Sequence, residues 1–286
     1  ANMTIIQGDT GLIIVDPLTS EETAEAALAL VREHLGDVPV VAVIFTHSHI
    51  DHFAGAWGVI NRDDYDAGKV RVIAPIGFMD EATSENIIAG TAMARRASFM
   101  YGRRLAKGPH GHVGSGLGKS PAYGTFGIAT PTEIIDTTGQ RLNIDGLDFV
   151  FQNAPGSEAP AELTFGIPEL AAYCGAEIAT RTMHNLYTLR GTKVRDALKW
   201  SAYIDEIIDL SADSDVYFAS HHWPVWGRTE IVDYLELHRD TYKFIHDQTV
   251  RLLNNGFTSR EIAERLQLPP ELAQTFSNRG YYGTLK

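Results

Sequence analysis

The hydrophobic and polar positions in the first half of the chain follow a pattern of strands alternating with helices. Residues 3–16, MTIIQGDTGLIIVD, form two apolar runs around a glycine-containing turn and predict a β-hairpin. Residues 20–36, SEETAEAALALVREHLG, predict a helix capped by Ser20. VVAVIFT (40–46) and VRVIAPI (70–76) are continuous apolar runs, a pattern that favours strands covered on both faces.

The later part of the chain continues this pattern and then becomes helical. We expect a long helix over 81–105, a glycine-rich loop over 106–127, short strands within 134–153, two apolar segments at 163–167 and 170–175, a helix over 194–210 and a strand near 216–220. From Thr229 onward the period is helical, with a T-x-x-E capping box at Thr258 and Glu261. We therefore predict two domains: a mixed α/β domain over 1–226 and a helical segment over 227–286.

Composition excludes several classes of protein. With 286 residues, of which 44% are hydrophobic, the chain has ample material for one large or two modest cores. No apolar run approaches the roughly 18 residues that a membrane span requires. The net charge of −12 argues against nucleic acid as a general partner, because phosphate binding depends on basic surface. Cys174 is the single cysteine, so an intrachain disulfide is excluded.

The segment FTHSHIDHFAG, residues 45–55, places three histidines and an aspartate directly after a predicted buried strand. On a loop that leaves a strand, His47 and His49 can turn the same way, while Asp51 and His52 point toward a second ion. Imidazole nitrogens and carboxylate oxygens are the ligands that zinc prefers. Such a short span cannot complete two sites, so we expect further ligands at other strand ends; the candidates are Glu158, Glu162, Glu177, His221 and His222.

Several motifs together carry a resemblance to a known family. T-H-S-H-I-D-H-F-A-G resembles the T-H-x-H-x-D-H signature of the metallo-β-lactamase superfamily. GSEAPAE, GAEIATRTMHNLYTLRG, ASHHWPVWG and RGYYGT resemble the alkyl sulfatase branch of that superfamily, and the similarity covers essentially the whole chain. The resemblance implies an α/β fold, the metallo-β-lactamase αβ/βα sandwich with two mixed sheets inside and helices outside. A helical segment, the start of a dimerisation domain, follows the sandwich.

The resemblance also implies two zinc ions and a ligand set for each. The family pattern makes His47, His49 and Glu158 ligands of one zinc. It makes Asp51, His52 and His221 ligands of the other, and Glu177 the carboxylate shared between them. Glu162 and His222 are then candidates for supporting positions rather than ligands.

The implied activity is hydrolysis of alkyl sulfate esters, such as dodecyl sulfate, to an alcohol and sulfate. Two Zn²⁺ ions outweigh the three carboxylates, so the site keeps a positive charge, and zinc lowers the pKa of bound water to about 7. The resemblance makes His184 the general acid and Arg190 the clamp on the sulfate oxygens, because a guanidinium fork matches an oxyanion. Asn185 and Tyr187 are weaker candidates for polar contacts to the substrate.

Two other patterns lead to weaker expectations. GSGLGKS (114–120) fails the phosphate-loop pattern, because Val113 stands where the first glycine belongs, and we expect a wall of the substrate entrance instead. TSREIAERLQLP and the residues after it lack a basic recognition face, so a homodimer contact is favoured over DNA binding. The apolar positions Ile231, Tyr234, Leu235, Tyr242 and Ile245 recur at helical spacing and predict a core or an interface.

Alternative functions remain open at this point. A lactonase, thioesterase or phosphodiesterase of the same fold is disfavoured by Glu158 in the place of the usual third histidine. A di-iron redox protein would carry glutamate where this chain has His49, so a hydrolytic metal is preferred. An inactive truncated module is a further alternative, because the chain starts abruptly and the family has additional residues at both ends. The first residues show no signal-peptide pattern, although the resemblance implies a periplasmic or secreted enzyme.

Overall fold

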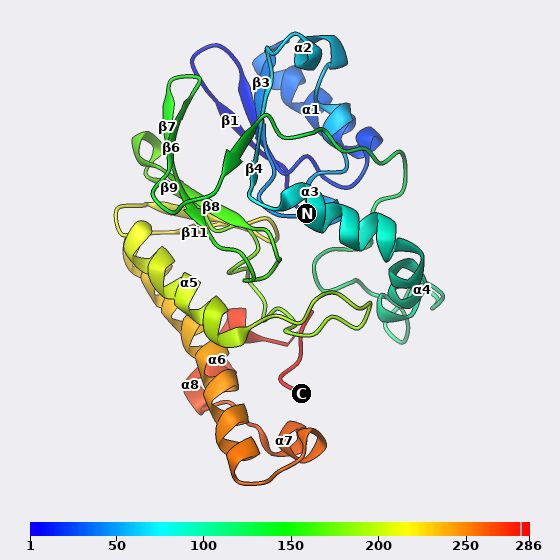
Figure 1. The fold of residues 1–286 in the computed structure, drawn as a ribbon, viewed down its shortest axis with the longest axis vertical. Coiled ribbons are helices and arrows are strands. Elements are labelled where there is room, and N and C mark those ends of the chain that lie inside the picture. Colours follow the sequence, from blue (N-terminus) through cyan, green and yellow to red (C-terminus); the bar gives the residue numbers. More distant parts are fainter. Residues whose placement is uncertain (281) are drawn as a thin grey trace.

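The chain folds into two β-sheets that pack face to face, with helices on both outer sides (Figure 1). The computed structural model describes residues 1–280 and 282–286; Tyr281, in the RGYYGT segment, lies outside the described residues. The strands are β1 (Thr4–Gln7), β2 (Leu12–Val15), β3 (Val40–Ile44), β4 (Arg71–Pro75), β5 (Glu133–Ile135), β6 (Arg141–Ile144), β7 (Leu147–Asn153), β8 (Leu163–Ile167), β9 (Ala172–Cys174), β10 (Val216–Phe218) and β11 (Val225–Trp226).

Both sheets are mixed, as predicted. The first sheet has the order β1-β2-β3-β4-β5, in which only the β1-β2 hairpin is antiparallel. The second sheet has the order β11-β10-β9-β8-β7-β6, in which only the β9-β10 pair is parallel. The parallel pairs bring the carboxyl ends of neighbouring strands to one edge, where their loops can meet.

The pattern of β2 shows how the sheets are buried on both faces. Its residues Leu12 and Ile14 pack toward the helices outside the first sheet, whereas Ile13 and Val15 pack between the two sheets. This alternation follows from the two-residue period of a strand. The layer between the sheets takes residues from both, including Ile44 of β3 and Phe165 of β8 with its aromatic neighbours on β7. The predicted αβ/βα sandwich is therefore confirmed.

The helices match most of the expected ranges. They are α1 (Glu21–Leu35), α2 (Arg62–Asp66), α3 (Phe78–Thr83), the π-helix Ser84–Ile88, α4 (Gly90–Met100), α5 (Ala197–Leu210), α6 (Arg228–Asn254), α7 (Ser259–Arg265) and α8 (Pro270–Gln274). Ser20 caps α1 and accepts from the backbone N–H of Thr23, and the capping box of Thr258 and Glu261 is present at α7. None of the described helices is both long and apolar enough for a membrane span.

The single long helix expected over 81–105 is wrong. The π-helix Ser84–Ile88 separates α3 from α4, and helical structure ends at Met100. The wider π turn changes the angular position of the side chains, so Glu85 is buried while Ile87 and Ile88 are exposed. A 3.6-residue pattern cannot reveal this local change of period.

The helix α6 packs against α5 on the outer side of the second sheet (Figure 1). The five apolar positions expected to form a core or an interface are all buried within this chain, in one cluster with Tyr173 of β9 and Tyr217 of β10. These positions are therefore core residues and are not free to pair with a second subunit. The division into domains 1–226 and 227–286 stays a prediction.

Candidate metal centre

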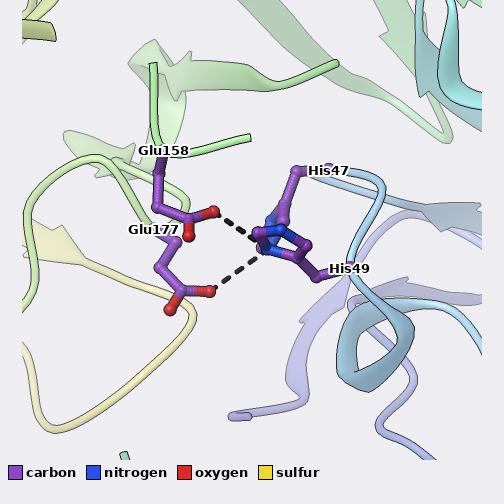
Figure 2. A group of neighbouring side chains, drawn as sticks. All are labelled: His47, His49, Glu158 and Glu177. Atoms are coloured by element: carbon purple, nitrogen blue, oxygen red, sulfur yellow. Dashed lines mark ion pairs between the residues drawn. The ribbon is translucent and has the colours of Figure 1, made fainter. Parts of the chain in front are cut away.

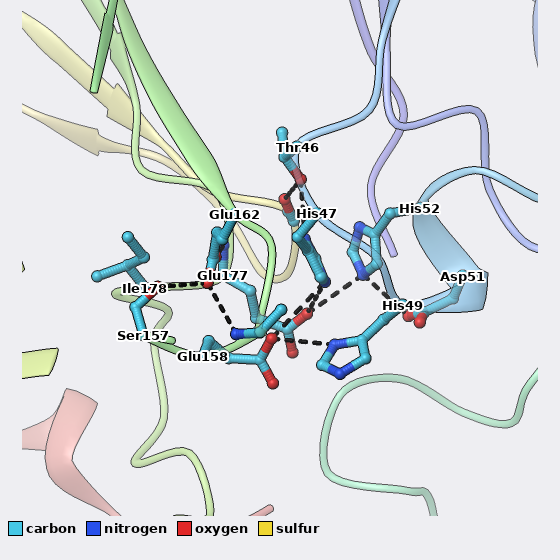
Figure 3. A network of polar contacts seen from close by, with 12 residues as sticks. Thr46, His47, His49, Asp51, His52, Ser157, Glu158, Glu162, Glu177 and Ile178 are labelled. Carbon is cyan, nitrogen blue, oxygen red and sulfur yellow. Dashed lines mark hydrogen bonds and ion pairs between the residues drawn. The ribbon is translucent and has the colours of Figure 1, made fainter. Parts of the chain in front are cut away.

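The histidines and carboxylates expected to bind metal come from four separate loops and converge on one another. Figure 3 shows all of them except His221. The loop after β3 carries His47, His49, Asp51 and His52; Glu158 follows β7, Glu177 follows β9 and His221 follows β10. All of these side chains are buried except Asp51, which is one-third exposed. Four imidazoles and three carboxylates do not gather in a protein interior without compensation, because burial penalises charged groups.

The first group contains His47, His49, Glu158 and Glu177 (Figure 2). The Nε2 atom of His47 lies 3.2 Å from Glu177 Oε2 and 3.7 Å from Glu158 Oε2. His49 approaches through its other ring nitrogen, with Nδ1 3.0 Å from Glu158 Oε2. One ligand atom from each of the four residues lies within 4.8 Å of the others, which matches the size of a metal site.

The second group contains Asp51, His52 and His221. The Nε2 atoms of His52 and His221 lie 3.2 and 3.4 Å from Asp51 Oδ2. Glu177 Oε2 is 3.2 Å from His52 Nε2 and 3.3 Å from His221 Nε2, so this carboxylate faces both groups. The structure thus brings together the seven residues that the family pattern nominated as ligands.

The sequence analysis missed Asp16, which contacts His52 directly and His47 through the hydroxyl of Thr46. It is buried at the end of β2, and its carboxylate accepts from the backbone N–H and the hydroxyl of Thr46 at 2.9 and 2.8 Å, from Ser220 Oγ at 2.7 Å and from His52 Nδ1 at 2.9 Å. Because the Thr46 hydroxyl gives its proton to Asp16, it accepts from His47 Nδ1 at 2.9 Å. Asp16 therefore fixes both imidazoles with the proton on Nδ1.

These hydrogen bonds use Nδ1 of His47 and of His52 and leave the Nε2 atoms of both rings free. His221 also donates through Nδ1, to the carbonyl of Leu117 at 3.2 Å. The buried atoms that have no hydrogen-bond partner among the described residues include the Nε2 atoms of His47, His52 and His221, and Oε2 of Glu158. Unpartnered lone pairs that converge in a buried space are the arrangement expected of metal ligands. The chain thus carries a centre whose donor atoms fit a metal ion.

The electrostatics of the centre favour positive charge. Burial acts to raise the pKa of Glu177, but the neighbouring imidazoles of His221, His184 and His47 hold it well below the usual range. Burial acts to lower the pKa of His52, but Asp51 and Asp16 raise it well above its ordinary value. The imidazoles and the carboxylates thus stabilise each other's charged forms in a dry site.

Glu162 supports the two loops that carry the glutamates. Its Oε2 accepts from Ser157 Oγ at 2.8 Å and from the backbone N–H of Ala159 at 3.0 Å, and its Oε1 accepts from the backbone N–H of Glu177 at 3.1 Å. Burial raises its pKa to about 7. Its contacts make Glu162 a scaffold beside the centre, in line with the expectation that it is a supporting residue.

Arg195 is a second residue that the sequence analysis missed. This buried guanidinium contacts both the backbone carbonyl and the Oε1 atom of Glu158, and it donates to Asn185 Oδ1 at 2.8 Å and Thr188 Oγ1 at 2.6 Å. The contact occupies one oxygen of Glu158 and leaves Oε2 for a metal. An arginine just before the N-terminus of α5 gives no sequence signal for this role.

A cavity of about 590 Å³ opens beside the centre. His184 and Arg190 line it together with His49, Asp51, Glu158, Glu177 and His221. The described residues that line it do not include Asn185 or Tyr187: Asn185 is held by Arg195 and Thr188, and Tyr187 is 59% exposed. Part of the wall comes from Ser115, Leu117 and Gly118 of the GSGLGKS segment.

His184 is held in place by the aromatic residues of α5 and α6. Its backbone N–H donates to the Tyr242 hydroxyl at 3.0 Å, and the Tyr242 ring stacks on Trp200 with centroids 4.4 Å apart. Its Nδ1 donates to the carbonyl of Asn185 at 2.9 Å, so Nε2 points at the centre, 3.1 Å from Oε1 of both Glu158 and Glu177. Burial lowers the pKa of His184, although Glu158 opposes the shift.

Comparisons with known proteins agree with this geometry. Residues 1–132 match the family model of the metallo-beta-lactamase superfamily. The chain therefore has the metallo-β-lactamase fold. Curated relatives of the chain are sulfatases. All 286 residues align with 42% of the length of a linear primary-alkylsulfatase from a Pseudomonas species, at 52% identity, and with 44% of the length of the alkyl/aryl-sulfatase BDS1 from Saccharomyces cerevisiae, at 49% identity. A solved structure, the stereoselective inverting sec-alkylsulfatase Pisa1 from Pseudomonas, superposes on the entire chain with a TM-score of 0.96, at 44% identity and over 45% of its own length. The chain therefore spans less than half the length of these three proteins.

Proposed function

We propose that this chain is the catalytic part of a metal-dependent alkyl sulfatase, which hydrolyses alkyl sulfate esters to an alcohol and sulfate. The observation that supports this most directly is the convergence of seven candidate ligand residues, all buried except Asp51, beside a cavity that Arg190 also lines. The similarity to alkylsulfatases over the whole chain supports the same substrate class.

We further propose that the centre holds two zinc ions. His47, His49 and Glu158 would hold one ion, Asp51, His52 and His221 the other, and Glu177 would lie between them. Imidazole and carboxylate are ligands that suit zinc. When bound, the ions would supply Lewis acidity and a hydroxide nucleophile near neutral pH.

The protein's own residues would bind and protonate the ester. The Arg190 guanidinium is largely buried at the cavity wall, with Nη1 3.4 Å from the Tyr282 hydroxyl, and its fork of donors suits the oxygens of a sulfate group. His184 would protonate the leaving alkoxide from Nε2 as an imidazolium, because its Nδ1 proton stays hydrogen-bonded to the Asn185 carbonyl. Glu158 and Glu177 beside Nε2 favour this charged form against burial. Met93, Ala97 and Phe126 give the cavity an apolar side that fits an alkyl chain.

The homodimer and the periplasmic or secreted location are also proposals, and they rest on the family resemblance. The buried positions of α6 do not contribute to a dimer contact.

Hydrolysis of dodecyl sulfate tests the proposed function. The protein loaded with zinc is expected to release sulfate and dodecanol in equal amounts, to lose the activity on chelation and to regain it when zinc is added. His184→Gln is expected to slow turnover about 10²–10⁴-fold while the metal stays bound. Activity that survives complete metal removal would overturn the proposal.

A further inference from the structure

A carboxylate that the proposed reaction does not use lies in the wall of the same cavity. Glu85, on the π-helix Ser84–Ile88, is only 7% exposed and lines the cavity. Its Oε2 lies 3.7 Å from His49 Nε2 and 3.8 Å from Arg190 Nη2, while its Oε1 has no hydrogen-bond partner among the described residues. A buried carboxylate with a free oxygen is unfavourable for stability, which indicates that its charge serves the cavity.

The arm that carries Glu85, which consists of α3, the π-helix and α4, contacts the loop of Arg190 both before and after Glu85 in the sequence. One turn before Glu85, Glu81 accepts from Lys193 Nζ at 2.8 and 2.7 Å. On α4, Arg96 donates to the backbone carbonyl of Arg190 at 3.4 Å. Glu85 is therefore held next to Arg190 by contacts outside the cavity, and its own side chain is not needed to attach the arm.

We propose that Glu85 selects the charge of the ester, so that the cavity accepts a monoanionic sulfate ester and disfavours a dianionic phosphate ester. This inference rests on the proposed function, since it concerns the same site. Sulfate and phosphate monoesters have the same tetrahedral shape and similar size, so the shape of the cavity cannot separate them. Their charges differ, because a phosphate monoester approaches a charge of about −2 near neutral pH.

The discrimination follows from Coulomb's law. The Glu85 carboxylate offsets the charge of Arg190, where the anionic head of the ester is expected to bind. Its repulsion is proportional to the ligand's charge, so a dianion is penalised about twice as much as a monoanion. A unit charge about 6 Å away in a partly solvated site changes affinity at least about tenfold per unit of ligand charge. Glu85→Gln removes this charge and keeps the shape of the side chain.

Binding of two ligands that the enzyme cannot hydrolyse tests the inference without depending on turnover. Hexanesulfonate is a monoanion, and hexylphosphonate is a dianion above its second ionisation. Their dissociation constants are measured by calorimetry on the zinc-loaded protein at a pH above that ionisation. We expect Glu85→Gln to improve the affinity for the phosphonate relative to the sulfonate by at least about tenfold.

Asp80→Asn is the control, because it removes a carboxylate charge from an exposed position on α3, five residues before Glu85, where the side chain does not line the cavity. It is expected to leave the ratio of the two affinities unchanged. Equal effects of Glu85→Gln on both ligands would overturn the inference and leave Glu85 as a structural residue.

The pH dependence of phosphonate binding provides a second test, in which each protein serves as its own reference. As the pH rises through the second ionisation of the phosphonate, the zinc ions and Arg190 favour the dianion, and the gain in affinity relative to the sulfonate is expected to be at least about tenfold smaller in the unmodified protein than in Glu85→Gln. The same gain in both proteins would contradict charge selection by Glu85. Hexanesulfonate that fails to bind at all, together with no release of sulfate from dodecyl sulfate, would overturn the proposed function as well.

Discussion

Asp16 is the residue through which the fold controls the metal centre most strongly, and Asp16→Asn isolates that control. Asn has almost the same shape, and it tolerates the left-handed backbone that Asp16 adopts at a φ of 54°. The substitution therefore changes the hydrogen bonds without changing the backbone. Asp16 has four donors around it: two from Thr46, one from Ser220 and one from His52.

The expected magnitude follows from those contacts. One carboxylate oxygen accepts from three donors and the other accepts from the backbone N–H of Thr46. An amide retains one acceptor oxygen and turns the other position into a donor, so at least one buried N–H faces another N–H. Each buried polar group left unsatisfied costs about 1–3 kcal/mol, and we expect a loss of about 3 kcal/mol, or a Tm lower by about 5–10 °C.

The metal affinity should fall as well, because His52 is no longer held with its proton on Nδ1. Loss of such a supporting contact typically weakens metal binding about 10–100-fold. Chelator competition measures the affinity, and thermal unfolding of the metal-free protein measures the stability. Asp145→Asn is the control, because Asp145 also adopts a positive φ of 48° and accepts from Thr10 and Gly11, but it lies at the hairpin turns remote from the centre.

Asp145→Asn is expected to lower stability and leave the metal affinity unchanged. If Asp16→Asn bound zinc as tightly as the unmodified protein, the reasoning about the tautomer of His52 would be wrong.

Three further predictions concern other parts of the chain. Burial lowers the pKa of His238 to about 4, so the folded protein holds this side chain neutral, and the resulting stability is present above about pH 6.5 and is lost as the pH falls toward 4. His238→Phe should reduce the loss of unfolding free energy over this pH range by up to about 3 kcal/mol. An unchanged pH dependence of the unfolding free energy would contradict this. Arg195→Lys keeps the charge but loses the fork on Glu158, and chelator competition should show metal binding at least about tenfold weaker, whereas an unaltered affinity would refute the positioning role. Thr258→Ala removes the cap of α7 and should cost about 1 kcal/mol in urea unfolding with no change in metal content; a parallel loss of metal would contradict the separation of α7 from the centre.

Much of the fold and of the ligand set could be predicted from local sequence. The strand β2 shows its burial in the run LIIV, and the cap of α1 at Ser20 depends on residues within one turn of it. The cluster of His47, His49, Asp51 and His52 is recognisable because four ligand-type residues within one short loop are rare in any other role. The distant ligands Glu158, Glu177 and His221 were assigned by family resemblance rather than by spacing.

Asp16, Arg195 and Glu85 show where local sequence is insufficient. Asp16 follows an apolar strand, as many structural aspartates do, and its importance comes from Thr46, Ser220 and His52, which are brought to it by tertiary contacts. Glu85 faces inward only because a π turn interrupts the helix pattern. These three roles depend on contacts between segments far apart in the chain, which no periodicity encodes.

The central claim is that seven side chains from four loops hold two metal ions, and anomalous X-ray scattering at the zinc edge tests it most directly. A crystal of the zinc-loaded protein should show two peaks. One should lie among His47, His49 and Glu158 and the other among Asp51, His52 and His221, with Glu177 between them. Peaks elsewhere in the chain, or no peak at saturating zinc, would contradict the claim.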